Sequence, residues 1–204
     1  MNVSFQIGAP LVLGPLLAAY AVVLALRARR GTAGSTGRYA VLRFTVVLYA
    51  AAVLSITVFP LNVTWGEYAN LMPWYSQVNW LPLLTMDVSA LPNVVMLVPL
   101  GLLFPLVSSR AASAGRVTVL TAIASAAIES AQMLSYVVFN NGRSVDINDL
   151  IANTLGGLIG WALLRAALRT ESLGGALRGA ALPGSAVALG TADPSRRSPA
   201  SVTG

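Results

Sequence analysis

The sequence contains no cysteine, no histidine and no lysine among its 204 residues. The absence of cysteine excludes disulfides and thiolate chemistry, and the absence of histidine excludes imidazole metal ligands and a histidine general base. We therefore expect neither a metal site nor a cofactor. Any catalysis would have to use carboxylates, arginine, serine, threonine or tyrosine.

Charged residues are also scarce. They make up 10% of the chain, whereas 56% of the residues are hydrophobic and the mean hydropathy is +0.72. A soluble domain contains about 25% charged residues, so the composition predicts a membrane protein. The net charge of +6 comes from arginines at the ends of apolar runs. No basic face is interleaved with aromatic residues, and we expect no nucleic-acid partner.

Five apolar runs approach the roughly 20 residues that a transmembrane helix needs. They cover residues 10–26, 41–59, 92–108, 117–138 and 150–168. The first run is followed by arginines rather than by a small-residue cleavage site, so we expect a retained helix and not a signal peptide. The sequence predicts an all-α polytopic membrane helix bundle of about five transmembrane helices, surrounded by the lipid bilayer.

The arginines predict how this bundle is oriented, because arginine is retained on the cytoplasmic side of a membrane. If the N-terminus lies outside, all of the 13 arginines except Arg143 fall on the cytoplasmic side. We therefore predict an external N-terminus and a cytoplasmic C-terminus.

We divide the chain into an N-terminal helical hairpin (1–58), a membrane domain (59–169) and a disordered cytoplasmic tail (170–204). The tail is rich in Gly, Ala, Ser and Pro and offers few large side chains to bury. Within the membrane domain, segment 61–91 is rich in Trp and Tyr, which favour the membrane interface. It is either a loop on the outer leaflet, or a lid or re-entrant segment over a site.

Polar side chains interrupt three of the predicted helices near their outer ends. Glu129 and Gln132 are three residues apart and share one helix face. Asp146, Asp149 and Asn153 follow i, i+3, i+7 spacing and form one stripe, with Ser144 or Asp146 as the expected N-cap. The helix predicted over 92–108 adds Asn93 near its outer end. Such residues are costly in lipid, so they either satisfy one another or mark a functional path.

Glycines extend the polar stripe of the last helix. Gly156, Gly157 and Gly160 follow Asn153, and Gly156 and Gly160 have the spacing that lets two helix backbones approach closely. Gly101 lies on the helix that carries Asn93. We expect these four glycines to pack helices together, so that the polar stripe faces another helix rather than lipid.

Antiparallel order places the polar residues of the three helices, with Arg143, toward the outer leaflet. Three interpretations remain open. Arg143 neutralises Asp146 or Asp149 in a buried structural network, or the residues form a pocket for an external or lipid-linked ligand, or they belong to a proton or ion path. The third is the weakest, because Glu129 alone lies deep and nothing comparable crosses the inner half.

The order of these motifs resembles the VanZ-like family. The motifs are Asn79-Trp-Leu-Pro82, Asn93-Val-Val-Met-Leu-Val-Pro-Leu-Gly101, Glu129-Ser-Ala-Gln132, and Arg143-Ser-Val-Asp146-Ile-Asn-Asp149-Leu-Ile-Ala-Asn153-Thr-Leu-Gly156-Gly157 with Gly160. Leu83 departs from the Phe that often continues the first motif. The resemblance implies a multi-pass protein of the bacterial plasma membrane. The family takes its name from a member associated with resistance to the glycopeptide teicoplanin.

Two functional hypotheses and one structural hypothesis follow. In the first, a non-enzymatic envelope protein binds a lipid-linked wall precursor or a glycopeptide at the polar residues, with Arg143 suited to a phosphate. In the second, paired carboxylates serve an intramembrane hydrolase or transferase as acid and base, or hold a divalent cation. In the third, the chain is a structural partner of another membrane protein, and the glycines matter more than the charges. We favour the first. The oligomeric state is left open by the sequence.

Overall fold

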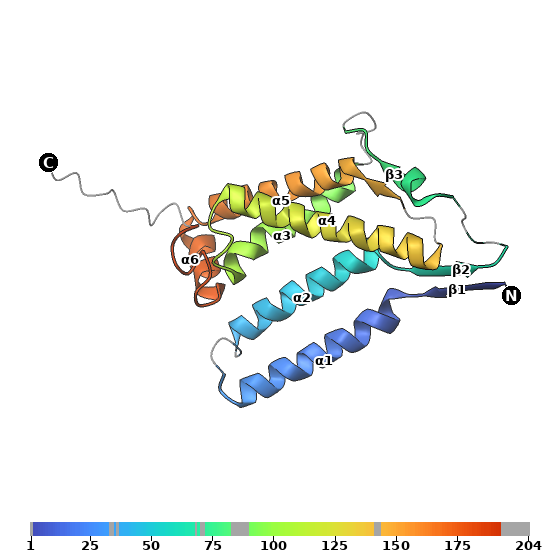
Figure 1. The fold of residues 1–204 in the computed structure, drawn as a ribbon. Coiled ribbons are helices and arrows are strands. Elements are labelled where there is room, and N and C mark those ends of the chain that lie inside the picture. Colours follow the sequence, from blue (N-terminus) through green and yellow to red (C-terminus); the bar gives the residue numbers. More distant parts are fainter. Residues whose placement is uncertain are drawn as a thin grey trace.

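The computed structural model describes residues 2–32, 35, 37–67, 69, 72–82, 90–140 and 144–192. Its long helices lie side by side in an elongated bundle (Figure 1). They are α1 (Ala9–Arg29), α2 (Arg38–Thr57), α3 (Leu91–Val107), α4 (Ala114–Phe139) and α5 (Ile147–Ala167). The prediction of an all-α membrane helix bundle is confirmed.

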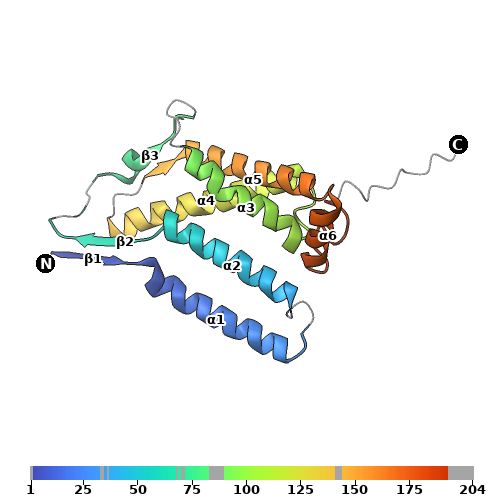
Figure 2. The ribbon, with the colours of Figure 1, turned by 180° about the vertical axis from the view of Figure 1, so that it is seen from behind.

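Four of these helices are long and apolar enough to cross a membrane, and α3 is an apolar helix of 17 residues. At 1.5 Å per residue α3 is about 26 Å long, a little short of a hydrocarbon core of about 30 Å. The count of five spans therefore stays a prediction. It is supported by the course of α3, which runs beside α5 in the bundle (Figures 1 and 2).

Short strands gather at one end of the bundle, which we call the strand end (Figure 1). Strand β1 (Val3–Ile7) pairs antiparallel with β2 (Leu61–Trp65), so the chain before α1 and the chain after α2 lie together. After the short 3₁₀ helix η1 (Trp74–Gln77), β3 (Val78–Asn79) pairs in parallel with β4 (Val145–Asp146). Main-chain pairing of β2 and β3 thus holds the described parts of segment 61–91, the aromatic segment, across this end of the bundle.

The opposite end carries the arginines, and we call it the arginine end. It contains the α1–α2 connection, the α3–α4 connection and the C-terminus of α5, followed by α6 (Glu171–Ala180). Every arginine that the structure describes lies toward this end: Arg27, Arg29, Arg30, Arg38, Arg43, Arg110, Arg116, Arg165, Arg169 and Arg178. The bundle is therefore strongly polarised in charge.

The expectation of a disordered tail is wrong for residues 171–192. Helix α6 is followed by turns whose Leu182 and Val187 are buried in a core cluster with residues of α3 and α5. The N–H of Leu182 donates to Leu106 O at 2.8 Å, and that of Val187 donates to Pro105 O at 3.1 Å. A helix leaves its last carbonyls without partners inside the helix, and this segment satisfies two of those of α3. Residues 193–204 lie outside the described part.

Glycines set the contact between α3 and α5. A Cβ added at Gly156 would lie 2.1 Å from Val94 O, and one at Gly160 would lie 2.0 Å from Val98 O. A Cβ at Gly101 would lie 1.9 Å from Gly157 O. These distances leave no room for a side chain, so the two backbones touch directly. This close approach fixes α5, and with it the polar residues at the N-terminal end of α5.

Candidate functional site

Three carboxylates lie near one another at the strand end and form what we call the carboxylate cluster. Glu129 comes from α4, Asp146 immediately precedes α5, and Asp149 lies in the first turn of α5. The charges of Asp146 and Asp149 both act on Glu129, and that of Asp146 also acts on Asp149. The repulsion among them means that neighbouring donors must hold the cluster together.

Asp146 is the N-cap of α5, one of the two positions that the sequence indicated. Its Oδ1 accepts from the backbone N–H of Asn148 at 2.8 Å and from the Asn148 side chain at 2.9 Å. Its Oδ2 accepts from Asn79 Nδ2 at 3.0 Å, because the β3–β4 pairing places Asn79 opposite Asp146. Asp146 therefore joins the aromatic segment to the start of α5.

Asp149 joins α5 to α3. Its Oδ1 accepts a hydrogen bond from Asn93 Nδ2, and both side chains are half-buried. On α3, Asn93 is adjacent to Val94, which meets Gly156, and on α5 Asp149 lies about two turns before Gly156. The close helix packing thus delivers the Asn93 amide to the Asp149 carboxylate.

Glu129 is the most buried member of the cluster, with 8% of its surface exposed. Its Oε2 accepts from the backbone N–H of Asp146 at 3.3 Å. A carboxylate in an apolar helix carries a large cost, and such residues usually face a bundle interior or a polar cavity. The Glu129 side chain extends from α4 to the start of α5, inside the bundle, and it also lines a cavity.

That cavity, the polar pocket, has a volume of about 230 Å³. Its lining includes Asn79, Glu129 and Asp146. It adjoins a larger cavity of about 480 Å³, the aromatic groove, whose lining includes Trp74 and Leu134. The two cavities share Val78, Trp80, Glu129, Ser130 and Val145. The two cavities are therefore neighbours, and Glu129 lines both of them.

Comparison with known proteins places this arrangement in a family. A family model described as VanZ/LLP1 matches residues 46–169, which is more than half of the chain and includes every member of the carboxylate cluster. The chain belongs to the VanZ/LLP1 family. The resemblance drawn from the motifs is thereby confirmed. Searches of curated proteins and of solved structures found no match.

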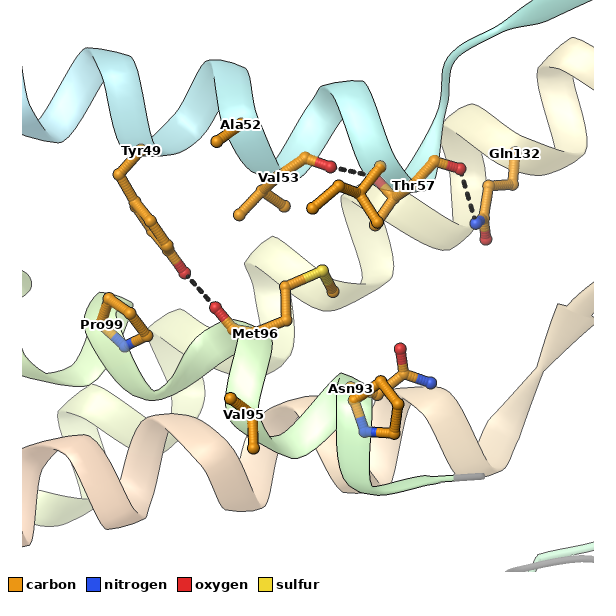
Figure 3. A pocket seen from close by; sticks show the side chains of 11 residues that line it. Tyr49, Ala52, Val53, Thr57, Asn93, Val95, Met96, Pro99 and Gln132 are labelled. Carbon is orange, nitrogen blue, oxygen red and sulfur yellow. Dashed lines mark hydrogen bonds between the residues drawn. The ribbon is translucent and has the colours of Figure 1, made fainter. Parts of the chain in front are cut away.

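Two of the predicted site residues lie apart from the carboxylate cluster of this VanZ/LLP1 domain. Gln132 Nε2 donates to Thr57 O of α2 at 2.9 Å, and the side chain lines a cavity between α2 and α3 (Figure 3). Asn153 Nδ2 donates to Ser125 Oγ of α4 at 2.9 Å, and Asn153 is 1% exposed. Arg143 lies outside the described residues.

The glycine stripe of the VanZ/LLP1 domain packs helices of this chain against one another. Gly156, Gly160 and Gly101 lie in the α3–α5 contact, and a Cβ at Gly157 would lie 2.2 Å from Thr121 Oγ1 of α4. This stripe is therefore not free to pack on another protein, which removes the main support for a purely structural partner role.

Sequence reasoning did not assign Asn79, Asn148 and Trp80 to the site. Asn79 begins the Asn-Trp-Leu-Pro motif of the family, and that motif was the signal that could have placed it there. Asn148 is off the polar stripe of α5, and only its contacts with Asp146 and with Leu81 O reveal it. Within the described ranges, no group of three or more acidic side chains is placed to hold a metal ion.

Proposed function

We propose that this VanZ/LLP1 protein acts at the bacterial cell envelope and binds a lipid-linked wall precursor or a glycopeptide at the carboxylate cluster. The observation that carries the proposal is that the aromatic groove adjoins the polar pocket and shares five lining residues with it, Glu129 among them. A lipid-linked ligand has an apolar chain and a polar head. The aromatic groove would hold the apolar chain of the ligand, and the polar pocket would hold its polar head.

The orientation supports the same proposal. Arginine-rich ends of membrane proteins stay in the cytoplasm, so the arginine end is assigned to the inside and the strand end to the outside. The polar pocket then opens toward the outer leaflet, where wall precursors and glycopeptides are met. The tryptophans of the groove, Trp74 and Trp80, suit the depth of the lipid headgroups.

The chemistry of the pocket indicates which part of a ligand it holds. Carboxylates accept hydrogen bonds, and amide side chains both donate and accept them. The cluster therefore favours amide N–H, hydroxyl or ammonium groups of a peptide or sugar head. Arg143, two residues before β4, remains the candidate for a phosphate because of its planar fork of donors.

The first experiment compares teicoplanin susceptibility of a sensitive host that expresses wild type, Glu129→Gln, Asp149→Asn or Arg143→Ala at equal membrane abundance. Glu67→Gln is the matched control, because Glu67 is an exposed carboxylate after β2 that bonds Asn2 Nδ2 at 3.0 Å. We expect wild type and Glu67→Gln to protect and the cluster variants to lose protection. Equal protection by all variants would show that the cluster is structural, and no protection by wild type would reject the glycopeptide role.

Binding is measured directly with the purified protein in nanodiscs and a lipid-linked wall precursor. The proposal expects saturable binding that Glu129→Gln weakens and Glu67→Gln leaves unchanged. Binding that is absent, or that is unchanged in every variant, would reject the precursor as the ligand.

One observation favours an enzymatic alternative. Glu129 and Asp146 both line the polar pocket, and two carboxylates facing one cavity can act as general acid and general base. Incubation of the nanodisc protein with the same precursor, followed by mass spectrometry, separates the alternatives. Cleavage or transfer products that are lost in Glu129→Gln would favour the enzyme, and unchanged precursor would favour binding alone.

A further inference from the structure

The polar pocket gathers carboxylates that the described part of the chain does not balance with a cation. Glu129 and Asp146 line the pocket, and none of its described lining residues is basic. The donors that the structure gives to the carboxylate cluster are neutral: backbone N–H groups and the side-chain amides of Asn79, Asn93 and Asn148. Every arginine that the structure describes lies toward the arginine end. Among the described residues, the cluster therefore lacks a countercharge.

One oxygen of Glu129 is open to the pocket. Oε2 accepts from the backbone N–H of Asp146 at 3.3 Å, whereas Oε1 accepts no hydrogen bond from a described residue. Glu129 Oε1 is nevertheless not sealed off, although the side chain as a whole is only 8% exposed. The sealed polar atoms without a partner in the described part of the bundle are Thr121 Oγ1, Gln132 Oε1, Asn153 Oδ1 and Trp161 Nε1. Glu129 therefore offers an accessible acceptor to a ligand in the cavities that it lines.

Two tryptophans lie beside this acceptor. Trp80 lines both cavities together with Glu129, and Trp74 lines the aromatic groove. Their side chains are 67% and 54% exposed, so much of each ring is available for contact with a ligand. A cation near the face of a tryptophan ring is attracted by the charge distribution of the ring. A carboxylate with aromatic rings beside it suits an organic ammonium group.

The same surroundings disfavour other head groups at this oxygen. A phosphate would face two carboxylates in one pocket, and like charges repel. A neutral hydroxyl could donate to Glu129 Oε1, but it would leave the charge of the cluster without compensation, which is costly in a bundle surrounded by lipid. A protonated amine donates up to three hydrogen bonds and also supplies the missing positive charge.

We propose that the polar pocket selects a protonated amine, so that its ligand is an amphiphile with an ammonium head and an apolar chain. The ammonium group donates to Glu129 Oε1 beside Trp80, and Asp146 lies on the wall of the same pocket. The chain lies in the aromatic groove along Leu134 and Val137. This inference rests on the proposed function, since it specifies the group by which an envelope ligand is held in the same site.

The test uses the full chain in phosphatidylcholine nanodiscs and a long-chain primary amine that carries a diazirine in its chain. The reference probes are the N-acetyl derivative, which keeps an N–H donor but is neutral, and the alkyl phosphate of the same chain. After irradiation, labelled peptides are quantified by mass spectrometry over a range of probe concentrations. We expect the amine to label α4 and the segment from η1 to β3 with an apparent Kd at least about tenfold lower than either reference, because a hydrogen bond between charged groups is stronger than a neutral one.

The first variant, Glu129→Gln, keeps the shape of the side chain and removes its charge. We expect the apparent Kd of the amine to rise at least about tenfold. The amine and the N-acetyl probe should then label α4 equally. Glu67→Gln is the matched control, because Glu67 is an exposed carboxylate at the same end that lines neither cavity. It should label as wild type does.

A second variant keeps the test independent of Glu129. Trp80→Leu removes an aromatic ring from the junction of the two cavities, and we expect it to weaken amine labelling about threefold relative to N-acetyl labelling. Trp65→Leu is the matched control, because Trp65 is also exposed but lies on β2 and lines neither cavity. It should preserve the preference for the amine.

Three results would overturn the inference. Equal apparent Kd values of the amine and the N-acetyl probe in wild type would mean that the charge of the head plays no part. Tighter labelling by the alkyl phosphate would mean that the pocket selects an anion. Amine labelling that is unchanged in both Glu129→Gln and Trp80→Leu, or that maps away from α4 and β3, would place the amine elsewhere.

These outcomes can be told apart from a failure of the proposed function. A wall precursor that binds in nanodiscs but is not displaced by the long-chain amine would refute the inference alone. Amine labelling that depends on Glu129, without any binding of the precursor, would refute the precursor as the ligand and leave the inference standing.

Discussion

The contact between α3 and α5 gives the sharpest prediction about stability. In Gly156→Ala, the new Cβ would lie 2.1 Å from Val94 O, whereas carbon and oxygen in close contact stay about 3.3 Å apart. The helices would have to separate locally by roughly 1.2 Å. The obstacle is a backbone carbonyl, so no rotamer change relieves it. Because Asp149 and Asn93 lie nearby on the same two helices, their hydrogen bond would also be stretched.

The expected magnitude follows from two opposing effects. Overpacking a tight contact costs about 1–3 kcal/mol and occasionally more. The backbone obstacle places Gly156→Ala at the upper part of this range. The higher helix propensity of alanine offsets about 1 kcal/mol. We expect a net loss of about 2 kcal/mol in the free energy of unfolding.

A second glycine provides the control for this prediction. Apart from its chain neighbours and the nearby backbone of α1 itself, no described atom lies within 4 Å of a Cβ added at Gly14. Gly14→Ala should therefore gain up to about 1 kcal/mol from helix propensity alone. The assay is equilibrium unfolding in mixed micelles, followed by tryptophan fluorescence. If Gly156→Ala proved as stable as Gly14→Ala, the direct backbone contact between α3 and α5 would be refuted.

Three further predictions concern the site, the tail and the orientation. Asn93→Ala leaves the Asp149 carboxylate without its donor, and we expect it to cost about 1–3 kcal/mol in the same unfolding assay; a double-mutant cycle with Asp149→Ala that gives no coupling would contradict the contact. Removal of residues 171–204 uncovers buried residues of α3 and α5 and frees the carbonyls at the end of α3; we expect a loss of at least about 2 kcal/mol, where a disordered tail would give no change. Because the chain has no cysteine, single cysteines report topology cleanly. Ser4→Cys should react with a membrane-impermeant maleimide on intact cells and Thr32→Cys should not, and the reverse pattern would invert the proposed orientation.

The helices could be predicted from the sequence because the length and apolar content of a segment are local properties. Each of the five apolar runs contains most of one long helix, and the N-cap at Asp146 follows from residue type and position. The family could be recognised because its motifs follow one another in order along the chain. By contrast, the pairing of β1 with β2 joins Ile7 to Leu61 across the whole α1–α2 hairpin. The sequence of neither strand indicates which segment it pairs with.

The tail was misjudged for a physical reason. Its Ala and Gly content offers little apolar area, which is typical of disordered segments. In the structure the backbone N–H groups of Leu182 and Val187 donate to carbonyls at the end of α3. The tail also buries Leu182 and Val187 against residues of α3 and α5, and composition reports neither these contacts nor the hydrogen bonds.

Glu129 and Gln132 show how one helix face serves two sites. Residues three apart on a helix are offset by about 60° around its axis, so sharing a face does not mean sharing a neighbour. Glu129 turns toward the start of α5 and lines the polar pocket, whereas Gln132 turns toward α2 and lines the cavity between α2 and α3. Asn93 lies between these regions, because it lines the cavity between α2 and α3 and donates to Asp149. Movement of α3 against α5 would therefore change both sites together, and the glycine contact that resists such movement holds their geometry constant.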